Sequence, residues 1–463
     1  MAQRPAEQPE PASHTPGRAD RATPDSRADP SAAPPPDSRA GAGAPPDSRA
    51  RATPESRASS GASAGPRADD RTAGIPEDRT DRAGGLRRRL ESVTGTPFTE
   101  GNEVTVLRNG DEIFPAMLGA IRGARRTVDL MTFVYWKGDI AVAFADALSD
   151  RAQAGIRVRL LIDALGGRLI DTGLVDRMDE AGVQVEWFRK PLLKSPFKAN
   201  HRLHRKVCVV DETVAFTGGV GIAEEWCGDA RDETEWRDTH LRVVGPAVDG
   251  LSSAFVQDWA ESGRALYDET DTFPTHVPSG SSTVEVIKGS ASLGWDDMQS
   301  VFHIMLHAAE QRLRIATAYF APDEEFLQTL VDTASRGVQV QLLLPGPHAD
   351  KRVCQLASEA VYDRLLHGGV DVLSFQPSML HQKVLTLDGY AAVVGSSNFN
   401  RRSLDHDEEV VMVILDEQIV ATLDRHLDDD VDRSVPIDLT RWRQRTRAQR
   451  VLELATTPIR RWL

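Results

Sequence analysis

HRLHRKVCVVDETVAFTGG, residues 201–219, returns in altered form as HQKVLTLDGYAAVVGSSN, residues 381–398. Both stretches carry the spacing H-x-K-x-x-x-x-D ahead of a glycine segment, first as His204, Lys206 and Asp211 and then as His381, Lys383 and Asp388. The apolar runs inside them are typical of buried strands. A pattern this specific, found twice, predicts two copies of one structural unit.

Further segments indicate that the whole unit is duplicated. AGIRVRLLID (residues 154–163) and RGVQVQLLLP (residues 336–345) align at an offset of 182 residues, and the two histidine motifs align at 177. A nearly constant offset across separate landmarks indicates an internal repeat.

Helical and strand patterns alternate from residue 86 onward. In the first half we expect strands at residues 127–136 and 156–163, with helices at 116–124 and 140–155. Such alternation favours a covered parallel sheet. We predict an α/β fold of two similar lobes, each a mostly parallel sheet flanked by helices, related by a pseudo-two-fold axis with one shared active site.

Composition divides the chain into four parts. Residues 1–85 hold about half of the 27 prolines and repeat the motif PDSRA, so we predict a disordered tail there. A polar, turn-rich stretch separates a first lobe at 86–270 from a second at 280–440. Residues 441–463 form a basic amphipathic C-terminal segment.

Charge and cysteine content narrow the classes of function. The formal net charge of -14 argues against general nucleic-acid binding, and three scattered cysteines predict neither a disulfide framework nor a zinc site. No apolar run approaches the ~18 residues that span a bilayer, and the chain begins without a signal-peptide pattern. We expect a soluble or peripheral protein of the cytoplasm.

If the two lobes meet, one site would hold two imidazoles and two ammonium groups. Residues two apart on a strand share a face, so each His and its Lys would project together. One imidazole can attack the phosphorus of a phosphodiester while the other protonates the leaving alcohol, and the lysines can stabilise the phosphate oxygens. This chemistry requires no metal and no cofactor.

The glycine segments suit the same phosphate. GSSN at residues 395–398 would bring the side chains of Ser396 and Asn398 toward it, with nearby backbone amides. One isolated H-x-K is more often a packed histidine and a solvated lysine. Two copies in register in matching halves argue against that structural interpretation.

These residues resemble the phospholipase D superfamily, whose signature H-x-K-x4-D-x6-G-S-x-N occurs twice. The second copy matches in full, whereas the first has Gly219 where Ser is usual and Gly221 where Asn is usual. WRDTHLRVVGPAV, YFAPDEEF and GSSNFNRRSL are similar to segments of bacterial cardiolipin synthases. The resemblance covers roughly residues 86–454.

The resemblance implies a metal-free phosphatidyl transferase that works through a phosphohistidine and passes a phosphatidyl group to an acceptor alcohol. It implies His204 as nucleophile and His381 as acid and then base. The implied catalytic set is His204, Lys206, Asp211, His381, Lys383 and Asp388, and the implied substrate-binding set is Gly219, Ser396, Asn398 and Glu409.

Some members of these sets have a second possible role. Asp211 and Asp388 are expected to tie strand to loop rather than to act directly. Glu409 could orient a catalytic imidazole or be a surface glutamate. The glycines at 219 and 221 remove two possible phosphate contacts, which puts rate and substrate range in question.

A lipid substrate requires contact with a bilayer. Residues 186–206 mix apolar anchors, among them Trp187, Phe188 and Phe197, with Lys and Arg, and the C-terminal segment adds further arginines. Each segment could instead pack against the domain. The expected partners are anionic phospholipids such as phosphatidylglycerol and the membrane surface at the inner face of the cell, and no nucleic acid is expected.

Three other functions stay open on the sequence. Phospholipid hydrolysis of the phospholipase D type would follow if water replaced the alcohol. Nucleic-acid phosphodiester cleavage is disfavoured by the acidic charge. A lipid-binding scaffold with a weakened site is suggested by GGVG at residues 218–221.

Overall fold

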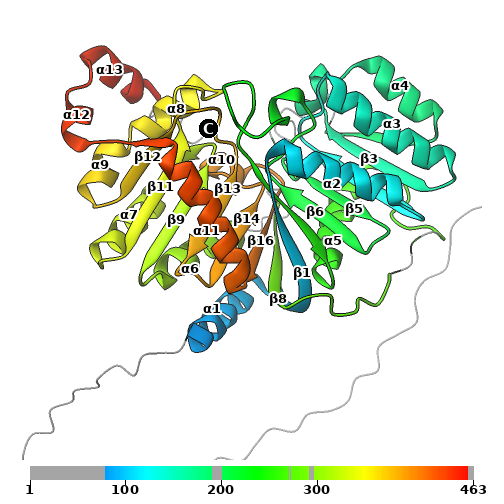
Figure 1. The fold of residues 1–463 in the computed structure, drawn as a ribbon, viewed down its shortest axis with the longest axis horizontal. Helices are drawn as coiled ribbons and strands as arrows, with labels where there is room; N and C mark the ends of the chain where they lie inside the picture. Colours follow the sequence, from blue (N-terminus) through cyan, green and yellow to red (C-terminus); the bar gives the residue numbers. More distant parts are fainter. Residues whose placement is uncertain (1–78, 190–200, 270, 272, 291–296, 457–463) are drawn as a thin grey trace, which may run out of the picture. The chain divides into compact units, whose positions relative to one another are not determined.

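One 15-stranded sheet runs through the part of the chain that the computed structural model describes, residues 79–189, 201–269, 271, 273–290 and 297–456 (Figure 1). Its strands are β1 (Thr99–Arg108), β2 (Thr127–Thr132), β3 (Arg157–Asp163), β4 (Gln184–Phe188), β5 (Val207–Val210), β6 (Val214–Gly218), β7 (Thr239–Val244), β8 (Ser282–Gly289), β9 (Arg312–Thr317), β11 (Gln339–Pro345), β12 (Asp371–Phe375), β13 (Lys383–Leu387), β14 (Ala391–Gly395), β16 (Glu409–Leu415) and β17 (Ser434–Pro436). A small separate sheet pairs β10 (Phe320–Ala321) with β15 (Phe399–Asn400).

The helices cover both faces of the sheet. They are α1 (Arg79–Thr94), α2 (Asn109–Gly123), α3 (Asp139–Gln153), α4 (Thr172–Glu180), α5 (Ala247–Trp259), α6 (Asp297–Ala308), α7 (Glu324–Ser335), α8 (Arg352–Glu359), α9 (Tyr362–His367), α10 (Arg401–Asp405), α11 (Glu417–Asp432), α12 (Leu439–Arg443) and α13 (Arg447–Thr456), with 3-10 turns η1 (Gly166–Leu169), η3 (Glu224–Trp226) and η4 (Ala260–Ser262). Figure 1 shows α3 and α4 beside β3 and, at the other end of the sheet, α7 and α9 beside β11 and β12.

The strand order is similar on the two sides of the central pair β1 and β8. Outward from β1 it runs β7-β6-β5-β2-β3-β4, and outward from β8 it runs β16-β14-β13-β9-β11-β12 and ends with the additional strand β17. Within the large sheet, parallel pairing joins β2–β3–β4 and β9–β11–β12, and the remaining pairs of described strands are antiparallel.

The prediction of a mostly parallel sheet is therefore wrong, although the α/β class is right. Parallel neighbours need a crossover connection, whereas antiparallel neighbours can be joined by a tight turn. Only three residues separate β5 from β6, and two of them, Asp211 and Glu212, adopt the positive φ values of 53° and 56° that a sharp reversal requires. The second part of the histidine motif therefore forms a β-hairpin, with Asp211 in its turn.

Side chains alternate between two cores along the strands, as a period of two requires. Val207 and Val209 pack in a core with α5 and α11, while Cys208 and Val210 pack on the opposite face with α2 and α3. The core beneath α5 and α11 includes strands from both halves of the chain, among them Val284 and Val410. All described residues belong to one compact unit.

The first helix begins before residue 86, where the first lobe was predicted to start. Helix α1 begins at Arg79, inside the predicted tail, and its Leu86 and Leu90 are buried in a core with Met298 and Phe302 of α6. A helix with apolar side chains must bury them against a partner, and here the partner is the second half. The remainder of the predicted tail, residues 1–78, lies outside the described residues.

The packing of α1 gives a testable stability effect. Leu90 is fully buried, so we expect Leu90→Ala to lower the free energy of unfolding by about 2–5 kcal/mol through lost contacts and the cavity left behind. Val93 on the same helix is half exposed, and Val93→Ala should change it by less than about 0.5 kcal/mol. Urea denaturation measures both. Equal stability of the two variants would contradict the packing of α1.

Within the described residues, none of the helices combines the length and the apolar content that crossing a bilayer requires.

Candidate active site

A cavity of about 250 Å³ brings the two histidine motifs together. His204 and Lys206 line it from the first half and His381 lines it from the second. Lys383 lies beside it, with Nζ 3.1 Å from Nδ1 of His381. Four of the predicted catalytic residues therefore gather at one place, although they are far apart in the sequence.

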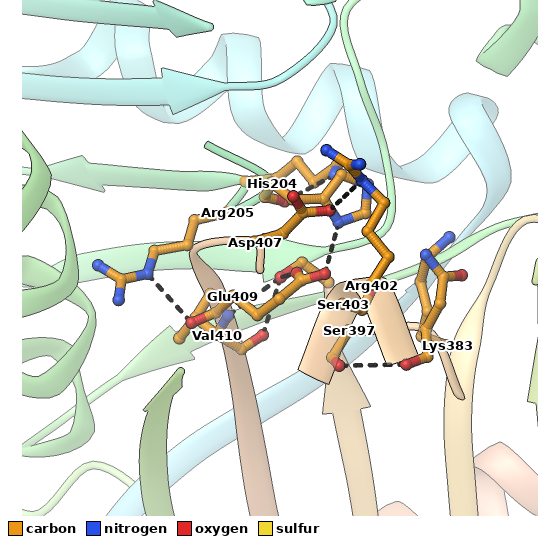
Figure 2. A network of polar contacts seen from close by, with 12 residues as sticks. His204, Arg205, Lys383, Ser397, Arg402, Ser403, Asp407, Glu409 and Val410 are labelled. Atoms are coloured by element: carbon orange, nitrogen blue, oxygen red, sulfur yellow. Dashed lines mark hydrogen bonds and ion pairs between the residues drawn. The ribbon is translucent and has the colours of Figure 1, made fainter. Parts of the chain in front are cut away.

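The His204 imidazole is held by a carboxylate from the other half of the chain. Nδ1 of His204 lies 2.8 Å from Oε1 of Glu409, the first residue of β16 (Figure 2). Backbone bonds fix the two segments side by side, because the His204 N–H donates to Glu408 O and the Glu408 N–H donates to Arg202 O. The buried Arg205 also donates to the Glu409 carbonyl. Glu409 is therefore a positioning group rather than a surface glutamate.

The His381 imidazole is held in the reciprocal way by Asp238, which the motif pattern does not include. Nδ1 of His381 lies 2.8 Å from Oδ2 of Asp238, just before β7, and the His381 N–H donates to Arg237 O at 2.7 Å. The repeat itself could have indicated Asp238, since β7 and β16 occupy corresponding places in the sheet and Glu409 begins β16. The correspondence between Asp238 and Glu409 is not visible in the sequence, because the chain between β6 and β7 is longer than that between β14 and β16 and the offset is no longer constant.

These hydrogen bonds fix the form of both imidazoles. A carboxylate can only accept, so each Nδ1 carries the proton and each Nε2 keeps its lone pair for reaction. Burial lowers the pKa of His204 to about 4 and that of His381 to about 3, against the opposing effect of the carboxylates. With these pKa values both rings are neutral near pH 7. A bound phosphodiester anion favours the protonated form of one of them.

The two lysines are buried beside the histidines and bonded to the backbone. Lys206 Nζ donates to His204 O at 2.7 Å, and Lys383 Nζ donates to His381 O. The expectation that His204 and Lys206 sit on a strand is wrong, because both precede the first residue of β5. Burial lowers the pKa of Lys206 to about 7 and that of Lys383 to about 8, although Glu409 and Asp238 oppose it.

Anion binding should therefore weaken as pH rises. A lysine is charged below its pKa, so the positive charge is present below about pH 7 and is lost above about pH 8. We expect the inhibition constant of sulfate, whose own charge is fixed over this range, to rise by about ten-fold between pH 6 and pH 9. Lys206→Met should remove much of this rise. An inhibition constant that does not change with pH would contradict the lowered pKa values.

Asp211 and Asp388 lie outside the residues that line the cavity. Asp211 accepts hydrogen bonds from the backbone N–H groups of Arg125, Arg126 and Thr127, which lead into β2. Asp388 accepts in the same way from the three residues that lead into β9, Glu310, Gln311 and Arg312. Both lie at the end of their strand away from the histidine. They join strand to loop, which is the role expected for them, although they were also included in the implied catalytic set.

Ser396 donates to one carboxylate and Gly219 leaves room for the other, whereas both were predicted to bind the substrate. Ser396 Oγ is buried and donates to Oε2 of Glu409 at 2.5 Å. In the first half a side chain at position 219 would collide with Asp238, since a Cβ there would lie 2.3 Å from Oδ1. The Trp226 indole N–H, 2.9 Å from Asp238 Oδ2, takes the part that the serine hydroxyl plays for Glu409.

The second glycine of the first motif makes room for the same tryptophan. A Cβ at Gly221 would lie 2.7 Å from Val134 Cβ and 3.2 Å from the Trp226 ring. The departure from the signature at residues 219 and 221 is therefore matched by Trp226. Asn398, the last predicted binding residue, lines a second cavity beside the first.

Two predicted membrane anchors in the first half pack against the core instead. Phe188 is 2% exposed, and Trp187 packs partly buried on the core with α2 and α3. Both lie on β4, where the strand pairs with β3. The third anchor, Phe197, lies outside the described residues.

The basic C-terminal segment is two short helices within the described residues. Trp442 of α12 packs against Tyr362, with ring centroids 5.0 Å apart. On α13, Val451, Leu452 and Leu454 are exposed.

In the ranges that the structure describes, no three His, Cys, Asp or Glu side chains are placed to hold a metal ion.

Comparison with known proteins identifies the family. The family model described as "Cardiolipin synthase, PLD-like domain" matches residues 117–248 and 303–431, so that each matched range holds one histidine motif and one carboxylate partner. The chain belongs to this family, within the phospholipase D superfamily. The superfamily resemblance inferred from the two motifs is confirmed.

Curated relatives extend the match over most of the chain. Cardiolipin synthase A of Pseudomonas aeruginosa is 33% identical over 347 residues, which cover 75% of this chain and 70% of the relative. Cardiolipin synthase 1 of Bacillus anthracis is 29% identical over 384 residues, which cover 81% and 75%. The crystal structure of a phosphatidylserine synthase from Haemophilus influenzae shares the fold, with a TM-score of 0.64 over 82% of this chain and all of that one at 14% identity.

Proposed function

We propose that this chain is a phosphatidyl transferase that makes cardiolipin or a related phospholipid through a phosphohistidine intermediate. The observation that carries the proposal is the crossed arrangement of the site: two imidazoles share one cavity, and each is oriented by a carboxylate from the opposite half. The names of the curated relatives support the same reaction class.

The proposed reaction has two steps. In the first, Nε2 of one imidazole attacks the phosphorus of the donor lipid, a P–N bond forms, and the P–O bond to the headgroup breaks while the other imidazolium gives its proton to the leaving oxygen. In the second, the acceptor hydroxyl gives its proton to that imidazole and attacks phosphorus, and the P–N bond breaks. Lys206 and Lys383 stabilise the charge on the phosphate oxygens in both steps.

The proposal includes a two-fold relation between the halves and binding to a membrane. A pseudo-two-fold axis through the shared site is supported by the corresponding strand orders and by the crossed carboxylate pairs. Binding at the inner face of the cell membrane, to anionic lipids such as phosphatidylglycerol, is supported by the exposed apolar side chains of α13 next to Arg447 and Arg450.

A weakened lipid-binding scaffold is disfavoured by the same geometry. The glycines that suggested it make space for Asp238 and Trp226, which orient His381. The meeting of both imidazoles and both lysines at one cavity supports an active enzyme instead.

The proposal is tested with purified protein and vesicles of phosphatidylglycerol. We expect cardiolipin and free glycerol in equal amounts, and the same rate with a metal chelator present. Phosphatidic acid as the sole product would mean hydrolysis instead of transfer. Cleavage of single-stranded DNA with no lipid product would reject the proposal.

A further inference from the structure

A second cavity of about 350 Å³ joins the first at His204. The two share Phe133, Leu165, His204, Tyr319 and Lys351, so they are two arms that meet at the reacting groups. The first is the aromatic arm, lined by Trp136, Trp226 and Trp236. The second is the polar arm, lined by Asn398, Arg402, Ser403 and Asp407.

The polar arm contains two buried acceptor atoms that no described donor satisfies. Asn398 Oδ1 and Asp407 Oδ1 lack a hydrogen-bond partner among the described residues, and the two residues are 1% and 6% exposed. The other oxygen of Asp407 accepts from Arg402 Nε at 3.2 Å (Figure 2). A buried polar atom left unpaired costs about 1–3 kcal/mol, so each such atom in a binding cavity indicates a ligand group that bonds to it.

The chemistry of these atoms restricts the ligand. Burial raises the pKa of Asp407 to about 7, with Arg402 and the Arg202 backbone N–H in opposition, so both forms of the carboxyl exist near neutral pH. A hydroxyl serves either form, because it can donate to the carboxylate or accept from the acid. Phosphodiester oxygens and the ester carbonyls of a diacylglycerol only accept, so they cannot satisfy Asn398 Oδ1 or the carboxylate.

We propose that the polar arm is the headgroup-alcohol subsite, that it takes a polyol such as glycerol, and that the hydroxyls not undergoing reaction bind Asp407 and Asn398. This inference rests on the proposed transferase function. The second step is the first in reverse, so the leaving and the entering alcohol use the same place. The polyol is either free glycerol or the glycerol headgroup of a lipid.

The test compares acceptors of equal carbon number. With bis(p-nitrophenyl) phosphate as donor, p-nitrophenol release reports donor cleavage, and the products report whether glycerol, 1-propanol or water received the phosphoryl group. We expect the wild type to favour glycerol over 1-propanol and Asp407→Ala to reduce this preference about ten-fold, since a hydrogen bond to a charged group is lost. Asp407→Asn keeps one acceptor oxygen and should lose only about three-fold, so it provides the test if the alanine variant does not fold.

Asp405 supplies a matched control. It lies two residues away on α10, pairs with Arg401 and is 32% exposed, outside the residues that line either arm. Asp405→Ala should keep the wild-type preference. An unchanged glycerol-to-propanol ratio in both Asp407 variants would overturn the inference.

Transfer to phosphatidylglycerol in vesicles separates the two sources of polyol. A loss in Asp407→Ala with both acceptors assigns the arm to the lipid headgroup, and a loss with free glycerol alone assigns it to free alcohol. If the wild type makes no lipid product, the transferase proposal fails, while the glycerol-to-propanol ratio on the chromogenic donor still tests the subsite.

Discussion

Replacing either His204 or His381 by Ala is expected to lower phosphatidyl transfer by about 10³-fold or more. In the proposed mechanism one imidazole forms the bond to phosphorus and the other moves the proton of the alcohol, so loss of either would stop both steps. The two rings line one cavity, so under this proposal they act on one substrate. The double variant should therefore be little worse than each single one, because the residues act as a unit.

The measurement is the initial rate of cardiolipin formation, with thermal unfolding recorded for each variant. His307→Ala is the matched control, since His307 is exposed on α6 and lies outside the residues that line the cavity. It should keep the wild-type rate. A histidine variant at 204 or 381 that kept a tenth of the wild-type rate would contradict the shared site.

Glu409→Gln and Asp238→Asn are expected to lower kcat by about 10²-fold or more with little change in KM. An amide can donate its N–H to the ring, which favours the tautomer with the proton on Nε2 and removes the lone pair that attacks phosphorus. Because the pairs are crossed, Glu409→Gln should alter His204, and Asp238→Asn should alter His381.

Nitrogen NMR of the imidazoles separates this positioning role from a structural one. We expect the proton on Nδ1 of both rings in the wild type and on Nε2 of only the affected ring in each variant. Asp405→Asn serves as the control that leaves both rings unchanged. A drop in rate without a change of tautomer would mean that the carboxylate acts in another way.

The sequence pattern predicts the repeated motif, the α/β class and the two histidines and two lysines that meet in the site, because these depend on local spacing. The strand predicted at residues 156–163 is observed at Arg157–Asp163, and the helix at 140–155 is Asp139–Gln153. Periodicity of apolar side chains is sufficient for such elements.

What the pattern missed depends on contacts between distant segments. Asp238 reaches His381 only because the folded halves meet, and the longer chain between β6 and β7 hides its correspondence to Glu409. Phe188 resembles a membrane anchor in a basic segment, yet it lies on β4 and its side chain packs in the core. The roles of Ser396 and Gly219 likewise follow from the carboxylates beside them.

The most direct test of the account is to find the covalent intermediate. Wild-type protein mixed with phosphatidylglycerol, quenched in alkali to preserve a P–N bond and digested for mass spectrometry, should carry a phosphatidyl adduct on the peptide of His204 or of His381. The adduct should be absent from the variant that lacks that histidine. Turnover in the wild type with no adduct on either histidine, or with the adduct on another residue, would contradict the proposed mechanism.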